Sequence, residues 1–341
     1  MSNHGHKTVT SIDVAKRAGV SQSTVSRAFS CSGKLSPKTR EAVIQAANEL
    51  GYRPNAIARS LVSNQTKFIG IVKSATDNSM FSELLTFMVE RLQKTEYQVI
   101  YYEVGHGQSI DDILSRVLQY RVEGIILLYA NLSSEITRVC RNMGIPVLQM
   151  LRYSTNAQAN VVSPANHAGA ALAVEHLLEK GYRSFAYITG ELNASSNMER
   201  QLGFLSRLAE LGYNDPVVLQ GDYTYESGCR AFPLLMEHSP KLPCGVLCAN
   251  DLIAMGVIDT ARAMNIRIPE DIGVMGFDNI FMSNWPAYQL TSLQNPTEEL
   301  ADRGVQLLID KIQNNDFTPD ILQLNFKLVE RRSTQLTGSP K

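Results

Sequence analysis

The sequence has few cysteines and no long apolar segment. Its five cysteines are odd in number and scattered, and only Cys244 and Cys248 lie close together, with no second pair or histidine cluster nearby. This distribution is typical of reduced thiols rather than of a disulfide framework or a zinc site. No segment approaches the roughly 18 uncharged apolar residues of a membrane span, and the polar start MSNHGHKTVTS is unlike a secretory signal. We therefore expect a protein of the cytoplasm with no metal site and no membrane partner.

Motifs of common enzyme sites are also missing. No G-x-G-x-x-G or phosphate-binding loop follows the first expected strand, and no G-x-S-x-G motif occurs. Four histidines lack the spacing of a catalytic triad or a metal site: His106, His167, His176 and His238. An enzyme remains the first alternative because doubly wound sheets support many chemistries, but we expect no catalytic residue and no cofactor.

The charge is divided unevenly along the 341 residues. Residues 1–67 hold ten Lys and Arg against three Asp and Glu, a net charge of +7, whereas the remainder holds 22 against 30, a net charge of −8. The length predicts more than one domain. A basic head on an acidic body indicates a nucleic-acid-binding module joined to a domain with another role.

The head has the pattern of a helix-turn-helix. Thr10 and Asp13 form a capping box, Gly19 ends the first helix, and a second helix follows over 21–29. A third helix is expected from Ser36-Pro37 to the residue before Gly51. The second helix would enter the major groove with side chains that can contact bases and phosphates: Gln22, Ser23, Thr24, Ser26 and Arg27. The alternative is a three-helix bundle with no role on DNA.

Two consecutive segments, DVAKRAGVSQSTVSRAF and SPKTREAVIQAANELGYRPNAIARSL, resemble the head and hinge of the LacI/GalR family of bacterial transcription regulators. The resemblance implies an all-α DNA-binding domain over 8–54 and a hinge helix and linker over 55–66. It also implies a homodimer on a pseudo-palindromic, double-stranded operator. The implied hinge contacts to DNA are Asn55, Ala58, Arg59 and Leu61. Leu61 would wedge into the minor groove, unless it packs on the body instead.

From Lys67 onward, apolar strands alternate with helical patterns, and the series occurs twice. Such alternation predicts parallel sheets covered by helices, here in two similar lobes. Strands are expected at 68–72, 97–102, 124–128, 147–150, 184–188, 217–219, 245–248, 273–277 and 321–328, with helices near 80–94, 109–120, 133–143 and 296–312 and a crossing at 290–293.

The resemblance continues through HLLEKGYRSFAYITG, CANDLIAMGV, IPEDIGVMGFDN and LVERRST. It implies an α/β, periplasmic-binding-protein-like effector and dimerisation domain over 67–335, with three crossings between its lobes. We expect lobe 1 at 67–162 and 293–320, and lobe 2 at 163–290 and 321–335. The sequence has no leucine heptads after LVERRST, so a dimer is expected rather than a tetramer.

Ligands of open parallel sheets bind at the carboxyl ends of the strands, and two such ends form a cleft. From strand ends and the resemblance we expect a small-molecule effector to contact Lys73, Phe81, Arg152, Arg200, Asn250, Asp278 and Trp285. The alternatives are structural caps for Asn250 and Asp278, a surface ion pair for Arg200, core packing for Phe81 and a covering role for Trp285. Where sugar-binding relatives commonly carry an aspartate, the chain has Leu151 and Arg152, which makes an anionic effector such as a sugar acid a hypothesis.

These patterns predict a sequence-specific DNA-binding regulator, a repressor controlled by a sugar, a sugar acid or a related metabolite. An activator or a corepressor-dependent regulator of the same fold is the nearer alternative, since the sign of regulation depends on operator placement. A transport-type binding protein is the more distant one, and the basic head disfavours it.

Overall fold

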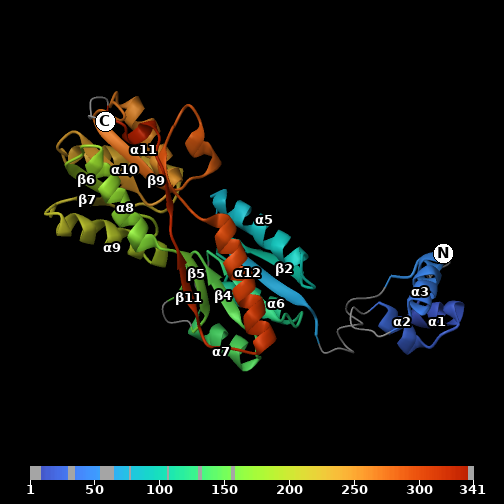
Figure 1. The fold of residues 1–341 in the computed structure, drawn as a ribbon. Coiled ribbons are helices and arrows are strands. Elements are labelled where there is room, and N and C mark those ends of the chain that lie inside the picture. Colours follow the sequence, from blue (N-terminus) through green and yellow to red (C-terminus); the bar gives the residue numbers. More distant parts are fainter. Residues whose placement is uncertain are drawn as a thin grey trace, which may run out of the picture. The chain divides into compact units, whose positions relative to one another are not determined.

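The computed structural model describes residues 9–29, 35–53, 65–76, 78–105, 107–129, 133–154 and 158–336. The chain divides into two compact units at Thr66 and Lys67, called here the head and the body (Figure 1). No helix among the described residues has both the length and the apolar character needed to cross a membrane.

The head is a three-helix unit, which confirms the predicted helix-turn-helix. Its helices are α1 (Ser11–Ala18), α2 (Gln22–Ala28) and α3 (Pro37–Leu50). The Asp13 carboxylate accepts hydrogen bonds from the Thr10 amide and hydroxyl at 2.9 and 2.7 Å, and Gly19 ends α1 with a φ of 66°. Small side chains form its core: Val14, Ala15, Val25, Ala28, Val43, Ala46 and Ala47.

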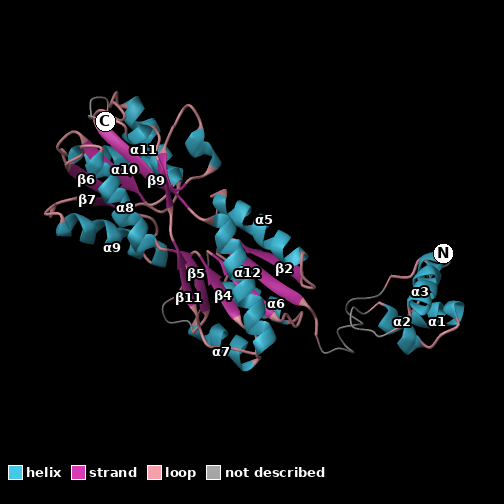
Figure 2. Ribbon diagram, viewed as in Figure 1, coloured by secondary structure: helices cyan, strands magenta, loops and turns pink. Residues whose placement is uncertain are grey.

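The first lobe of the body contains a six-stranded parallel sheet, ordered β11-β5-β4-β3-β1-β2. Figure 2 shows strands in magenta and helices in cyan. Its strands are β1 (Phe68–Ser74), β2 (Gln98–Val104), β3 (Gly124–Leu128), β4 (Val147–Met150), β5 (Asn160–Pro164) and β11 (Ile321–Leu324). Two separate apolar clusters cover it, one with α5 (Met80–Gln93) and α12 (Thr297–Asn314), the other with α6 (Ile110–Leu118) and α7 (Ser134–Asn142). Burial on both sides explains why β3 is entirely apolar beyond Gly124.

The second lobe contains the other six-stranded sheet, ordered β12-β10-β9-β8-β6-β7, in which only β12 runs antiparallel to its neighbour. Its strands are β6 (Ser184–Ile188), β7 (Val217–Leu219), β8 (Cys244–Cys248), β9 (Ile272–Asp278), β10 (Thr291–Gln294) and β12 (Lys327–Val329). Its helices pack as two pairs, α8 (Asn166–Glu179) with α9 (Ser195–Glu210) and α10 (Tyr225–Glu237) with α11 (Asp251–Ala263). Two short 3-10 helices complete it, η1 (Phe281–Asn284) and η2 (Arg332–Thr334).

The chain passes between the sheets after β5, after β10 and after β11, and these crossings correct the expected lobe boundaries. The single strand expected at 321–328 is wrong, because β11 belongs to the first lobe and β12 to the second. Phe326 separates them by packing on Phe277 of the second lobe, with 5.2 Å between ring centroids. The crossing expected at 290–293 is also displaced, since residues 291–294 form β10. β5 was not predicted, and it extends the first lobe to residue 164.

Candidate effector site and DNA-binding surface

The predicted base-reading residues lie on α2, one turn after Gly19. Ser26 and Arg27 are exposed, and the exposed Gln22 donates from Nε2 to the Ser11 hydroxyl at 3.0 Å. Ser23 and Thr24 bond through their hydroxyls to Ser21, the N-cap of α2, at 2.8 and 2.9 Å. Thr24 therefore supports the helix start. The predicted hinge contacts lie outside the described residues: Asn55, Ala58, Arg59 and Leu61.

The body has a pocket between its lobes, where the carboxyl ends of strands from both sheets meet. It encloses about 430 Å³ of space between atoms, part of it open to solvent. The lining residues are Thr76, Asn78, Met80, Phe81, Tyr129, Leu151, Arg152, Pro164, Ser196, Arg200, Tyr223, Asn250, Asp278 and Asn295. Five of the seven predicted effector residues are among them.

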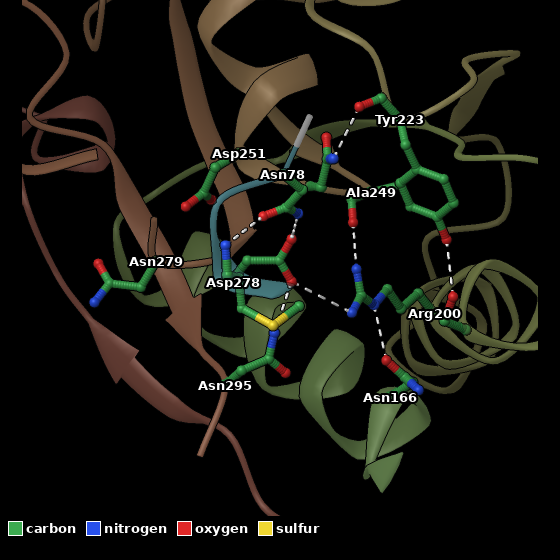
Figure 3. Close-up of polar contacts among 12 residues, drawn as sticks. Asn78, Asn166, Arg200, Tyr223, Ala249, Asp251, Asp278, Asn279 and Asn295 are labelled. Atoms are coloured by element: carbon green, nitrogen blue, oxygen red, sulfur yellow. Dashed lines mark hydrogen bonds and ion pairs between the residues drawn. The ribbon is translucent and has the colours of Figure 1, made fainter. Parts of the chain in front are cut away.

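Asp278 ends β9 at the centre of this site (Figure 3). Its Oδ2 accepts from the Asn78 amide at 2.6 Å and its Oδ1 from the Asn295 amide at 2.7 Å. Asn78 belongs to the first lobe and Asn295 to a crossing, so the carboxylate joins both parts of the body. The φ of Asp278 is 101°, a strained conformation for a side-chain-bearing residue. Such strain is held in place by the surrounding contacts and is typical of binding sites.

Arg200 is held by three groups from the second lobe. Its Nε donates to the Asn166 Oδ1 at 2.8 Å, its Nη1 donates to the Ala249 carbonyl, and its Nη2 lies 3.7 Å from Oδ1 of Asp278. The guanidinium also lies over the Phe277 ring, 4.2 Å from the centroid. Arg200 is thus fixed in orientation, and its charge faces a carboxylate.

Asn250 combines a structural role with a place in the pocket lining. Its Oδ1 caps α11 by accepting from the Ile253 amide at 3.0 Å, while its Nδ2 donates to the Tyr223 carbonyl at 3.0 Å. The Tyr223 hydroxyl lies 3.0 Å from the Ser196 hydroxyl. A Cβ on Gly190 would approach the Tyr223 ring to 2.1 Å, so this turn requires glycine for close packing.

Three aromatic rings form one wall of the pocket. Tyr129 packs edge-on against Phe81 of the same lobe and Tyr223 of the other, with centroid distances of 5.0 and 6.3 Å. Burial raises the pKa of both tyrosines above the ordinary value, so their hydroxyls remain protonated donors at neutral pH. Such rings offer apolar faces with polar edges, a combination suited to a sugar-like ligand.

Two predicted effector residues lie outside the pocket lining. Lys73 is paired in register with Glu103 of the neighbouring strand, and its Nζ bonds that carboxylate at 2.7 Å. Trp285 follows η1 with 44% of its surface exposed and packs edge-on against Phe281. We correct both expectations, because the strand register gives Lys73 another partner and η1 leads Trp285 to the surface.

Several lining residues were not predicted, although a signal existed for some. Tyr129 and Leu151 directly follow strands, Thr76 lies two residues after one and Pro164 ends one, so the strand-end rule that indicated Asp278 applied to them too. Asn295 directly follows β10, which was expected to be a crossing, and Asn78 and Tyr223 come from loops that only the tertiary fold brings to the cleft. Within the described ranges, no His, Cys, Asp or Glu side chains are grouped as a metal site.

The comparisons with known proteins agree with this architecture. Residues 11–55 match the model of "bacterial regulatory proteins, lacI family", and residues 174–334 match that of a "periplasmic binding protein-like domain". The chain is 30% identical to catabolite control protein A of Priestia megaterium over 96% of this chain and 99% of that protein. It is 32% identical to the transcriptional repressor PurR of Erwinia tasmaniensis over 94% and 95%.

The chain belongs to the LacI family of bacterial regulatory proteins. It is a DNA-binding transcriptional regulator, as predicted from the resemblance of its sequence. The members of this family are regulators rather than enzymes.

Solved LacI-family structures extend the likeness to nearly the whole chain. A Lac repressor dimer bound to operator and the anti-inducer ONPF matches with a TM-score of 0.86 and 27% identity, covering 97% of this chain and all of that one. A complex of the regulator CelR with cellobiose matches with a TM-score of 0.72 and 28% identity, covering 95% and 99%. The predicted fold class, a helix-turn-helix head on a two-lobed α/β domain, is confirmed.

Proposed function

We propose that this LacI-family chain is a cytoplasmic repressor that binds a pseudo-palindromic operator as a homodimer. Its affinity for the operator falls or rises when it binds a small, uncharged, hydroxyl-rich effector. The observation that carries the effector proposal is the Asp278 carboxylate. It lies in the cleft with Asn78 and Asn295 on its two oxygens and Arg200 facing it. The carboxylate can accept hydrogen bonds from ligand hydroxyls, and the guanidinium and amide groups beside it can donate to them.

The charges around the pocket favour an uncharged ligand over the anionic one considered from the sequence. Arg152 is paired with Glu191 at 2.7 Å, and Arg200 faces Asp278. Lys73 is paired with Glu103 away from the lining. A carboxylate or phosphate on the ligand would therefore have to displace a resident acidic group.

Two buried polar atoms in the lining have no hydrogen-bond partner within the described part of the chain, Oδ1 of Asn295 and Nε of Arg152. One is an acceptor and the other a donor. A hydroxyl group can serve either, which supports a ligand with several hydroxyls.

The relatives support the remaining parts of the proposal. PurR of Erwinia tasmaniensis is named a repressor, and the Lac repressor matched here is a dimer on its operator. CelR binds cellobiose, an uncharged sugar. The exposed Arg27 and Ser26 on α2 supply groups that can read bases and contact phosphates.

The DNA part is tested by selecting duplexes from a random pool with the full-length protein and measuring their affinity by fluorescence anisotropy. Arg27→Ala should weaken the selected duplex by about 1 to 3 kcal/mol and relax preference at one base position. Unchanged affinity and unchanged base preference in this variant would contradict a base-reading role for α2.

The effector part is tested by a thermal-shift panel of neutral sugars and the corresponding sugar acids. Neutral members should stabilise the protein and change its DNA affinity. Asp278→Ala and Arg200→Ala should abolish this response while leaving the DNA affinity of the ligand-free protein close to that of the wild type. Arg207→Ala is the control, since this α9 arginine pairs with Glu175 and Glu210 outside the lining and should respond normally. Stabilisation by sugar acids alone would overturn the uncharged ligand class.

A further inference from the structure

A second set of polar contacts joins the lobes, beside the pocket rather than at its centre. Arg152, which follows β4 of the first lobe, donates from Nη2 to Oε2 of Glu191 at 2.7 Å. Glu191 follows β6 of the second lobe, and its Oε1 accepts from the Tyr129 hydroxyl at 3.0 Å. One carboxylate of the second lobe is therefore held by two side chains of the first.

The first-lobe side of this contact is preorganised. The Arg152 side chain is 9% exposed, and its guanidinium lies over the Tyr129 ring, 4.9 Å from the centroid. Tyr129 and Leu151, at the ends of two neighbouring strands, have φ values of 54° and 70°. Backbone held in this region is costly and is maintained where the fold needs a particular side-chain position.

The partner on the second lobe is more accessible. The Glu191 side chain is 42% exposed and lies in the turn between β6 and α9. Because a long exposed side chain loses conformational freedom when it is held, the net stabilisation from this contact is small and the contact can open.

We propose that Arg152, Tyr129 and Glu191 form a latch that holds the two lobes of the body together without any ligand. Closure of the cleft then does not depend on the effector alone, and an effector shifts the lobes only by its differential affinity for the closed and open arrangements. The latch goes beyond the proposed function, since it concerns the lobes themselves.

The chain contains a reporter next to the latch. The Tyr153 amide donates to the hydroxyl of Ser195 on α9 at 2.9 Å, so its hydrogen bond crosses between the lobes. Exchange of this amide with deuterium requires that the contact open. It therefore reports lobe opening in the free protein, without DNA or effector.

The experiment is hydrogen–deuterium exchange of the full chain, followed on peptides that contain Tyr153. Glu191→Ala and Arg152→Ala should each speed exchange of this amide by about threefold or more. The double variant should be no faster than the faster single one, because both substitutions break the same contact. Tyr129→Phe, which removes one donor and keeps the ring, should have a smaller effect.

The matched control is Glu175→Ala, which removes an ion pair of 2.9 Å with Arg207 inside the second lobe and should leave Tyr153 exchange unchanged. Independent, multiplicative effects of the two latch substitutions would overturn the proposal, as would unchanged exchange in Glu191→Ala with a native melting profile. If that variant does not fold, the latch is tested by exchange in Tyr129→Phe and by the salt dependence of exchange in the wild type. Exchange of the Tyr153 amide that does not rise with salt contradicts the latch. The DNA and effector assays are separate, so failure of the latch leaves the proposed function standing.

Discussion

Two buried ionisable side chains in the second lobe respond to pH in opposite directions. Asp251 is fully buried at the start of α11, where the Ile280 amide and the hydroxyls of Ser283 and Ser292 donate to its carboxylate. Burial, and then repulsion from Asp278, raise its pKa to about 7. His176 is buried on α8 with its Nε2 2.9 Å from the Thr334 hydroxyl, and burial lowers its pKa to about 4.

The direction of each pH effect follows from the number of protons that the folded and unfolded states bind. Between about pH 4 and 7 the folded protein holds the Asp251 proton that the unfolded chain has released, so this group lowers stability as pH rises. Between about pH 4 and 6.5 the unfolded chain protonates His176 and the folded protein does not, so this group raises stability as pH rises. At about 1.4 kcal/mol per pKa unit, the effect is about 4 kcal/mol for Asp251 and about 3 kcal/mol for His176, and the two oppose each other over most of this interval.

We expect substitution of either residue to reveal the contribution of the other. Asp251→Asn should make the free energy of unfolding rise more steeply from pH 4 to 7 than in the wild type, whereas His176→Gln should make it rise less or fall. Urea unfolding followed by fluorescence of the single tryptophan, Trp285, measures both. Parallel profiles for the wild type and Asp251→Asn would show that Asp251 titrates alike in the folded and unfolded states.

Strands that are buried on both faces were identified from the sequence. Four apolar residues follow Gly124 in β3, and five consecutive residues of β8 are buried, so continuous apolar runs predicted them well. β5 was missed because Asn160, Ser163 and Pro164 interrupt its apolar pattern. β11 and β12 were merged, since the alternation of apolar and polar residues continues without a break through Asn325 and Phe326.

The candidate site also contains some residues that could be predicted from the sequence and others that could not. Asn250 and Asp278 follow or end strands, so their place at the cleft could be predicted from position alone. Asn78 and Asn295 meet Asp278 only because three separate segments converge, which a one-dimensional pattern does not contain. Lys73 also ends near a strand terminus, but its cross-strand partner Glu103 was not considered, and that pairing decides its role.

The core of the head consists of small side chains, so the loss of a single methyl group should lower its free energy of unfolding. Val43 of α3 is fully buried, whereas its neighbour Ile44 is 39% exposed. Val43→Ala should lower the free energy of unfolding of the head by about 1 to 3 kcal/mol and weaken DNA binding, while Ile44→Ala should change both little. Thermal unfolding by circular dichroism, with the body transition as internal reference, measures this. Equal effects of the two substitutions would contradict the observed core.

Gly190, in the turn between β6 and α9, packs directly against the Tyr223 ring. Gly190→Ala should displace the Tyr223 ring from Ser196, weaken the effector-induced thermal shift and destabilise the body by about 1 to 3 kcal/mol. Gly105→Ala is the control, because the nearest atom to its Cβ, from Gln108, would be 3.5 Å away. If the overlap is the cause, Gly190→Ala should destabilise a Tyr223→Ala protein by less than it destabilises the wild type. An equal loss in both backgrounds would locate the strain elsewhere in the turn.

For the whole molecule, the separation of charge predicts how it binds DNA. A homodimer presents two segments of net charge +7 to the phosphates, while the remainder of each chain is acidic. Affinity for the selected duplex should fall about a thousandfold or more between 50 and 200 mM salt, linearly in the logarithms, because counterions are released on binding. Fluorescence anisotropy across a salt series measures this slope. A fragment of residues 67–341 should not bind, and equal binding by that fragment would exclude the head as the DNA-binding unit.

The short crossing between β11 and β12 sets a geometric limit on motion within the body. Only Asn325 and Phe326 lie between the last residue of one strand and the first of the other. With 3.8 Å between consecutive Cα atoms, the strand ends can never be more than about 11 Å apart. The crossing is a tether that allows the lobes to rotate and prevents them from separating. Insertion of a few flexible residues there would lengthen this tether and leave the crossings after β5 and β10 as the remaining limits on lobe movement, without altering any side chain that lines the pocket.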